Sequence, residues 1–190
     1  MIQTRIAIFA SGTGSNALTI IKHFRDHSSI AVACILTNNS TAKVIEKTKA
    51  FGIPQVICTN EEAAFGTFLI EKCAEFKVDF IILAGYLRKI PVELIQAFPE
   101  RIINVHPALL PKFGGRGMYG MNVHRAVHTQ NETVSGITIH FVNEEFDKGR
   151  IIQQFECLIS DTETPEDIQQ KVQKLEHTYF ATIIEKTITS

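Results

Sequence analysis

The feature that most constrains the fold is a regular alternation of short apolar runs with helix-length segments. The runs are nearly continuous in apolar residues, as strands covered on both faces are, and they occupy residues 5–10, 30–37, 55–59, 79–84 and 101–105. Helix-length segments separate them at 15–26, 41–51, 61–76 and 91–97. Because strand–helix–strand connections are right-handed crossovers, this order predicts an α/β fold with an open, mostly parallel, twisted sheet and helices on both faces.

The last third of the chain has a different pattern. Residues 133–142 and 151–158 are consecutive strand-like runs with no helix between them, which predicts an antiparallel strand pair near the C-terminus. A closing helix is expected over 165–186, with Thr164 as N-cap and Pro165 as its first residue. No repeat or linker is visible, so a single domain over residues 1–190 is expected.

Composition excludes several classes of function. The chain is 45% hydrophobic and carries a net charge of -1, so no global field favours nucleic acid or a membrane surface. No apolar run reaches the ~18 residues of a membrane span, and no signal peptide pattern opens the chain. The four cysteines lack a C-x-x-C spacing and are expected to be buried free thiols. A cytoplasmic protein is therefore expected.

A glycine-rich loop, FASGTGSNA, follows the first run and opens the first helix. Gly12, Gly14 and Ala17 match the dinucleotide-binding pattern, and small residues let backbone N–H groups approach an anion at a helix N-terminus. The acidic residue that a NAD site needs about 20 residues further on is missing from LTNNS. A dinucleotide site and a simple tight turn stay open, and the pattern favours a terminal phosphate.

A second polar group stands at the end of the fifth run. Asn104 and His106 are two residues apart and therefore project from the same face of a strand, at the carboxyl end where such sheets bind ligands. They could be two satisfied polar groups, but the pair followed by Pro107 favours ligand contacts. An acid from NEEFDKG could orient the imidazole and raise its pKa, and Asp147 is the candidate, although spacing alone does not select it.

Other chemistries find less support. His124 and His128 lie four residues apart on an expected helix and could form a metal pair, but H-E-x-x-H and a third ligand are missing. No G-x-S-x-G turn and no nucleophilic cysteine motif is present, which disfavours a covalent acyl-enzyme. No metal is expected.

Five stretches carry a family resemblance: SGTGSN, LAGYLRKI, INVHPALLPKF, GITIHFVNEEFDKGRIIQQ and VQKLEH. Together they resemble the phosphoribosylglycinamide formyltransferases, folate-dependent enzymes of de novo purine biosynthesis. The resemblance implies a Rossmann-like formyltransferase fold. It also implies transfer of a formyl group from 10-formyltetrahydrofolate to the primary amine of glycinamide ribonucleotide.

The same resemblance implies the site residues. The catalytic residues would be Asn104, His106 and Asp147, with His106 as a charged donor. Substrate contacts would come from Gly12, Thr13, Gly14, Ser15, Asn16, Pro107, Gln173 and Glu176. Folate contacts would come from Leu87, Arg88, Lys89, Ile90, Asn104, Asn143 and Glu144. The implied partners are the two small molecules, with no nucleic acid or membrane, and the protein would be a monomer or homodimer.

Two stretches depart from the family pattern. The segment KFGGRGMYGMNVHRAV is longer than usual and contains Gly114, Gly115, Gly117 and Gly120, which suits a mobile lid or a surface elaboration. In TNEEAAFG, Glu62 stands where the family often has an arginine against the folate.

Related families and one other class compete with this interpretation. Methionyl-tRNA formyltransferase and formyltetrahydrofolate hydrolase share the N-x-H motif, but they carry further domains that this sequence does not lead us to expect. A sugar-nucleotide formyltransferase would bind a diphosphate. A non-catalytic nucleotide-binding module would bind a ligand without transferring a formyl group.

Overall fold

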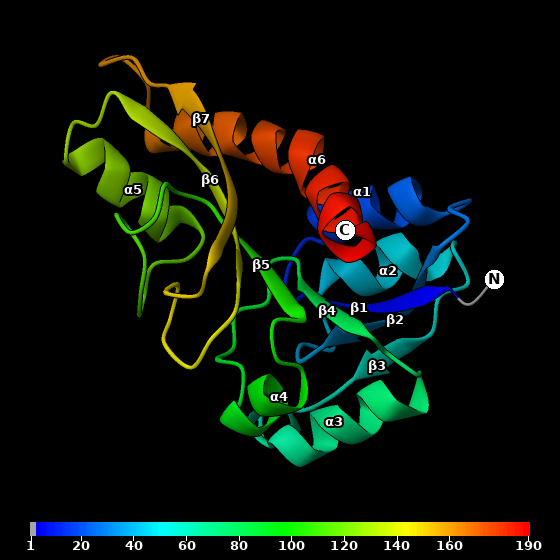
Figure 1. The fold of residues 1–190 in the computed structure, drawn as a ribbon. Helices are drawn as coiled ribbons and strands as arrows, with labels where there is room; N and C mark the ends of the chain where they lie inside the picture. Colours follow the sequence, from blue (N-terminus) through cyan, green and yellow to red (C-terminus); the bar gives the residue numbers. More distant parts are fainter. Residues whose placement is uncertain (1–2) are drawn as a thin grey trace. The chain divides into compact units, whose positions relative to one another are not determined.

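The computed structural model describes residues 3–190, and the strands in this part of the chain form one sheet (Figure 1). The strands are β1 Thr4–Phe9, β2 Ile30–Thr37, β3 Gln55–Ile57, β4 Phe80–Leu83, β5 Ile102–His106, β6 Val134–Phe141 and β7 Ile151–Leu158. Their order is β3-β2-β1-β4-β5-β6-β7. The sheet is open and mostly parallel, and β6 and β7 form an antiparallel pair, so the predicted fold class is confirmed.

The chain divides into two compact units. The N-terminal unit runs to Ile103 and also includes Ile188–Ser190, and the C-terminal unit is Asn104–Thr187. The expectation of a single domain stays a prediction.

Helices follow most strands in the described residues. They are α1 Ser15–Phe24, α2 Lys43–Lys49, the 3-10 helix η1 Glu62–Ala64, α3 Gly66–Glu75, α4 Val92–Ala97, α5 Met121–Thr129 and α6 Pro165–Thr189. Within the N-terminal unit, α1 and α2 lie on one side of strands β1 to β4, and α3 and α4 lie on the other (Figure 1). This two-sided cover explains why Ile6, Ile8 and Phe9 of β1 are fully buried.

One predicted helix is interrupted. The segment 61–76 forms η1 and then α3, because Phe65 is extended between them. Thr59 and Glu62 close the turn that leads into η1: the Glu62 carboxylate accepts from the Thr59 N–H at 2.7 Å, and the Thr59 hydroxyl accepts from the Glu62 N–H at 3.1 Å. The start of α3 lies close to α4, since a Cβ on Gly66 would be 2.6 Å from the Cβ of Glu93.

The structure also bears on the predicted cap of the last helix, the cysteines and membrane-spanning helices. Thr164 caps α6, because its hydroxyl accepts from the N–H of Asp167 at 3.2 Å, although the helix runs to Thr189 rather than ending at residue 186. All four cysteines are free, and Cys157 alone is only half-buried. Among residues 3–190, no helix has the length and apolar character that a bilayer crossing requires.

Candidate active site

The C-terminal unit brings the predicted catalytic side chains together. Asn104 and His106 leave the same face of β5, and His106 is only 3% exposed. Asp147 lies in the turn between β6 and β7, with its Oδ2 3.6 Å from Nδ1 of His106. The other ring nitrogen of His106, Nε2, donates to the carbonyl of Phe113 at 2.8 Å. These contacts bind both sides of the imidazole and fix its plane.

The glycine-rich segment after β5 supports Asp147 directly. The N–H of Gly115 donates to Oδ2 of Asp147 at 2.8 Å. A Cβ on Gly114 would lie 2.5 Å from Cδ2 of Leu110 and 3.2 Å from the Cβ of Asp147, so the close approach requires glycine there. Part of this insertion is therefore in contact with the cluster, and its role as a lid stays a prediction.

His140 belongs to the same cluster and was missed by the sequence analysis. Its Nδ1 donates to the carbonyl of Phe141 at 2.8 Å, which leaves Nε2 to accept from the amide of Asn104 at 3.1 Å. The same Nε2 lies 3.7 Å from Oδ1 of Asp147. Each carboxylate oxygen of Asp147 thus faces one imidazole. The available signal was a histidine inside the mostly apolar strand-like run ITIHFV.

Burial dominates the electrostatics of both imidazoles. It lowers the pKa of His106 and of His140, while Asp147 and a backbone carbonyl act in the opposite direction on each ring. The expectation that Asp147 keeps His106 charged is therefore wrong for the free protein, because the loss of hydration outweighs the carboxylate at 3.6 Å. A neutral His106 with Nε2–H bonded to Phe113 presents its Nδ1 lone pair toward Asp147. The ring can take up one proton there and hold it against the carboxylate.

A third buried imidazole lies on α5. Burial, with the nearby His106, lowers the pKa of His124 to about 4, and its Nδ1 is buried with no hydrogen-bond partner. His128, one turn later, is exposed. Within residues 3–190, no group of three or more His, Cys, Asp or Glu side chains is arranged to hold a metal.

The remaining predicted residues of this unit lie next to the cluster residues along the chain or on α6. Pro107 directly follows β5, and Asn143 accepts from the N–H of Glu145 at 3.1 Å in the turn that contains Glu144 and Asp147. Gln173 and Glu176 are half-buried and three residues apart on α6, so they share one face of that helix.

The glycine loop lies in the N-terminal unit, between β1 and α1. Gly14 is the N-cap of α1 with a left-handed φ of 73°, and a Cβ there would be 2.7 Å from the side chain of Val44. Gly12 and Thr13 are exposed, and a Cβ on Gly12 would meet nothing within 4 Å. Ser15 and Asn16 begin the helix. The loop therefore has one glycine that the fold requires and one that it does not.

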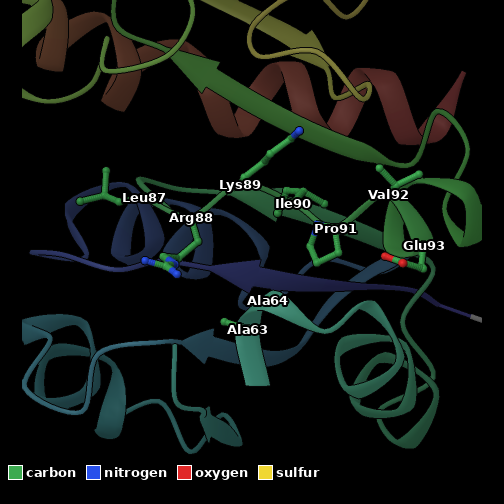
Figure 2. A pocket seen from close by; sticks show the side chains of 9 residues that line it. All are labelled: Ala63, Ala64, Leu87, Arg88, Lys89, Ile90, Pro91, Val92 and Glu93. Carbon is green, nitrogen blue, oxygen red and sulfur yellow. The ribbon is translucent and has the colours of Figure 1, made fainter. Parts of the chain in front are cut away.

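A pocket of about 420 Å³ lies in the same unit (Figure 2). Its lining includes all four predicted folate residues of the segment after β4, and further residues that the sequence did not suggest. The full lining is Ala63, Ala64, Leu87, Arg88, Lys89, Ile90, Pro91, Val92 and Glu93. Arg88 and Lys89 leave the chain in opposite directions, and Glu93 adds an acid to the wall (Figure 2). Glu62, the first residue of η1, directly precedes the lining residue Ala63.

The chain thus has an open α/β sheet with a glycine loop after its first strand, and an Asn-x-His strand end that faces an aspartate. The formyl transferase family matches residues 4–184, and the chain belongs to that family. It is 41% identical over 188 residues to the chloroplastic phosphoribosylglycinamide formyltransferase of Arabidopsis thaliana, covering 96% of this chain and 64% of that protein.

Bacterial proteins are similar over nearly their whole length. The phosphoribosylglycinamide formyltransferase of Bacillus subtilis is 38% identical over 189 residues, covering 97% of this chain and 94% of that protein. The crystal structure of the Bacillus halodurans enzyme superposes with a TM-score of 0.89 at 33% identity, covering 98% and 96% of the two chains. The chain spans 64% and 60% of the length of two plant relatives.

Proposed function

We propose that the chain transfers the formyl group of 10-formyltetrahydrofolate to the primary amine of glycinamide ribonucleotide. The products are N-formylglycinamide ribonucleotide and tetrahydrofolate, in de novo purine biosynthesis. The observation that carries the proposal is the arrangement of Asn104, His106 and Asp147, with Asp147 Oδ2 3.6 Å from His106 Nδ1. The family and the similarity to phosphoribosylglycinamide formyltransferases support the choice of substrates.

The amine does not need a strong base. An α-amino group titrates near ~8, so a useful fraction is already neutral at neutral pH. The amine attacks the formyl carbon, and a tetrahedral intermediate forms with a negative oxygen and a positively charged nitrogen. The amide of Asn104 donates a hydrogen bond to that oxygen. His106 donates to it from Nδ1 once that nitrogen has taken up a proton, because Nε2–H is already bonded to the carbonyl of Phe113.

The neutral state of His106 in the free protein is consistent with this order of reaction steps. As negative charge develops on the oxygen beside the ring, it raises the pKa of His106 and favours proton uptake. The excess proton of the attacking nitrogen passes to the His106–Asp147 pair. It then passes to the folate nitrogen as the carbon–nitrogen bond to the folate breaks. No step in this scheme uses a metal.

Binding is assigned to separate groups of residues. In the N-terminal unit, the substrate phosphate is assigned to the loop of Gly12, Thr13, Gly14, Ser15 and Asn16, and the folate to Leu87, Arg88, Lys89 and Ile90. In the C-terminal unit, Pro107, Gln173 and Glu176 contact the ribonucleotide, and Asn104, Asn143 and Glu144 contact the folate. We propose that both units form one formyltransferase domain, active as a monomer or homodimer in the cytoplasm.

One assay tests the proposal. Consumption of 10-formyltetrahydrofolate is followed with and without glycinamide ribonucleotide, and the formylated amine is identified by mass spectrometry. The proposal requires consumption that depends on the amine and equals the product formed. Consumption without the amine would identify a hydrolase, and ligand binding without any consumption would identify a non-catalytic binding module.

A further inference from the structure

Three side chains of the N-terminal unit form a continuous chain of hydrogen bonds. The hydroxyl of Ser11 donates to Oδ1 of Asn38 at 2.6 Å, and Nδ2 of Asn38 donates to Oδ1 of Asn60 at 2.8 Å. Ser11 follows β1, Asn38 follows β2, and Asn60 follows β3. The chain therefore joins the carboxyl ends of three neighbouring parallel strands.

One end of this chain holds the first wall of the pocket. The hydroxyl of Ser11 accepts from the N–H of Leu87 at 3.1 Å, and the N–H of Ser11 donates to the carbonyl of Gly85 at 3.0 Å. Leu87 is the first residue of the segment that lines the pocket. Because Ser11 is only 8% exposed, water competes little for these bonds.

The other end reaches the opposite wall. Asn60 lies in the turn that Thr59 and Glu62 close before η1, and η1 contributes Ala63 and Ala64 to the pocket. Figure 2 shows these two alanines on a different segment from Leu87 and Arg88. The hydrogen-bond chain is thus a cross-tie between the two segments that face the cavity.

We infer that Ser11, Asn38 and Asn60 are positioning residues that set the spacing between the two walls of the folate pocket. The inference rests on the proposed function, because it takes the pocket to be the folate site. Loss of the cross-tie leaves the His106–Asp147 chemistry intact and weakens folate binding. The effect therefore falls on the KM for the folate and spares kcat.

The test uses variants that break or keep single bonds. Asn38→Leu removes both side-chain bonds of the middle residue, and Asn60→Leu removes only the last acceptor. Asn60→Asp keeps an acceptor oxygen for Asn38 and serves as the conservative rescue. Asn39→Ala is the matched control, because its side-chain oxygen accepts only local bonds, from the N–H and hydroxyl of Thr41.

Steady-state kinetics and calorimetry of tetrahydrofolate binding give the readouts. Asn38→Leu and Asn60→Leu should raise the folate KM and the tetrahydrofolate Kd by about three- to tenfold, as expected for one or two hydrogen bonds, with kcat within about twofold. Asn60→Asp and Asn39→Ala should match the wild type. Unchanged constants in both leucine variants, or a kcat that falls as much as the folate affinity, would overturn the inference.

The outcome separates this inference from the proposed function. A wild-type protein that transfers no formyl group refutes the proposed function, and the calorimetric Kd values then decide the inference alone. If the wild type does not bind tetrahydrofolate, the inference is overturned as well. A wild type that transfers the formyl group while both leucine variants keep its folate constants overturns only the inference.

Discussion

At the residue scale, the two glycines of the first loop can be separated experimentally. A Cβ on Gly14 would lie 2.8 Å from Cα of Val44, so a substitution there disturbs the packing of α2 as well as the loop. Gly12 has open space, and its substitution should leave the fold intact. Gly12 is therefore the residue that tests anion binding.

Gly12→Ala should raise the KM for glycinamide ribonucleotide by about tenfold, because the added methyl group keeps the phosphate from the backbone N–H groups. The melting temperature should stay at the wild-type value. Gly14→Ala should lower the melting temperature, since it places a side chain at a left-handed φ of 73° against Val44. If Gly12→Ala left the KM for glycinamide ribonucleotide unchanged, the loop would be only a tight turn.

Some site residues could be predicted from the sequence and others could not. Asn104 and His106 could be paired from their two-residue spacing alone, because strand geometry fixes which face each side chain occupies. His140 could not be found in this way, since its bond to Asn104 joins residues 36 positions apart. The direction of the His106 pKa was expected wrongly, because burial is a property of the folded structure and the sequence shows only the nearby acid.

At the element scale, the interruption between η1 and α3 brings α3 close to α4. A Cβ on Gly66 would be 2.6 Å from Cβ of Glu93 and 3.3 Å from the N–H nitrogen of Leu94. Helical periodicity predicted one continuous segment over 61–76. A periodic pattern of apolar residues does not reveal a single extended residue, such as Phe65, or a close contact with a helix distant in sequence. Strands β1, β2, β4 and β5 were located well because their apolar runs are largely buried on both faces.

Gly66→Ala should reduce the free energy of unfolding by about 1–3 kcal/mol, because the methyl group forces Glu93 and the start of α4 to move. Urea denaturation at neutral pH measures the loss. Gly12→Ala is the control, since it adds the same methyl group where nothing lies within 4 Å. Equal stability of the two variants would show that α3 and α4 adjust freely.

At the scale of the whole molecule, three buried imidazoles make stability depend on pH. The folded-state pKa of His106, His124 and His140 lies below the ordinary value of 6.5, so the unfolded chain binds more protons below that pH. The free energy of unfolding should therefore be greatest above pH 6.5 and fall as the pH decreases. For His124 the fall continues to about pH 4, its folded-state pKa.

Denaturation curves between pH 7.5 and 4.5 check this expectation. His124→Leu should flatten the dependence on pH below 6.5, whatever its effect on stability at neutral pH, because it removes the group with the pKa of about 4. His128→Leu, on the exposed side of the same helix, should keep the wild-type slope. Parallel slopes for the wild type and His124→Leu would contradict the assignment.

The central claim is that Asn104, His106 and Asp147 carry out formyl transfer, and the kcat of the Asp147→Asn variant tests it most directly. This change keeps the size of the side chain and removes the charge that stabilises the proton that His106 takes up during the reaction. We predict that kcat falls by ~10² or more, while the dissociation constants of both substrates stay close to the wild-type values. A variant that turns over at the wild-type rate would contradict the account.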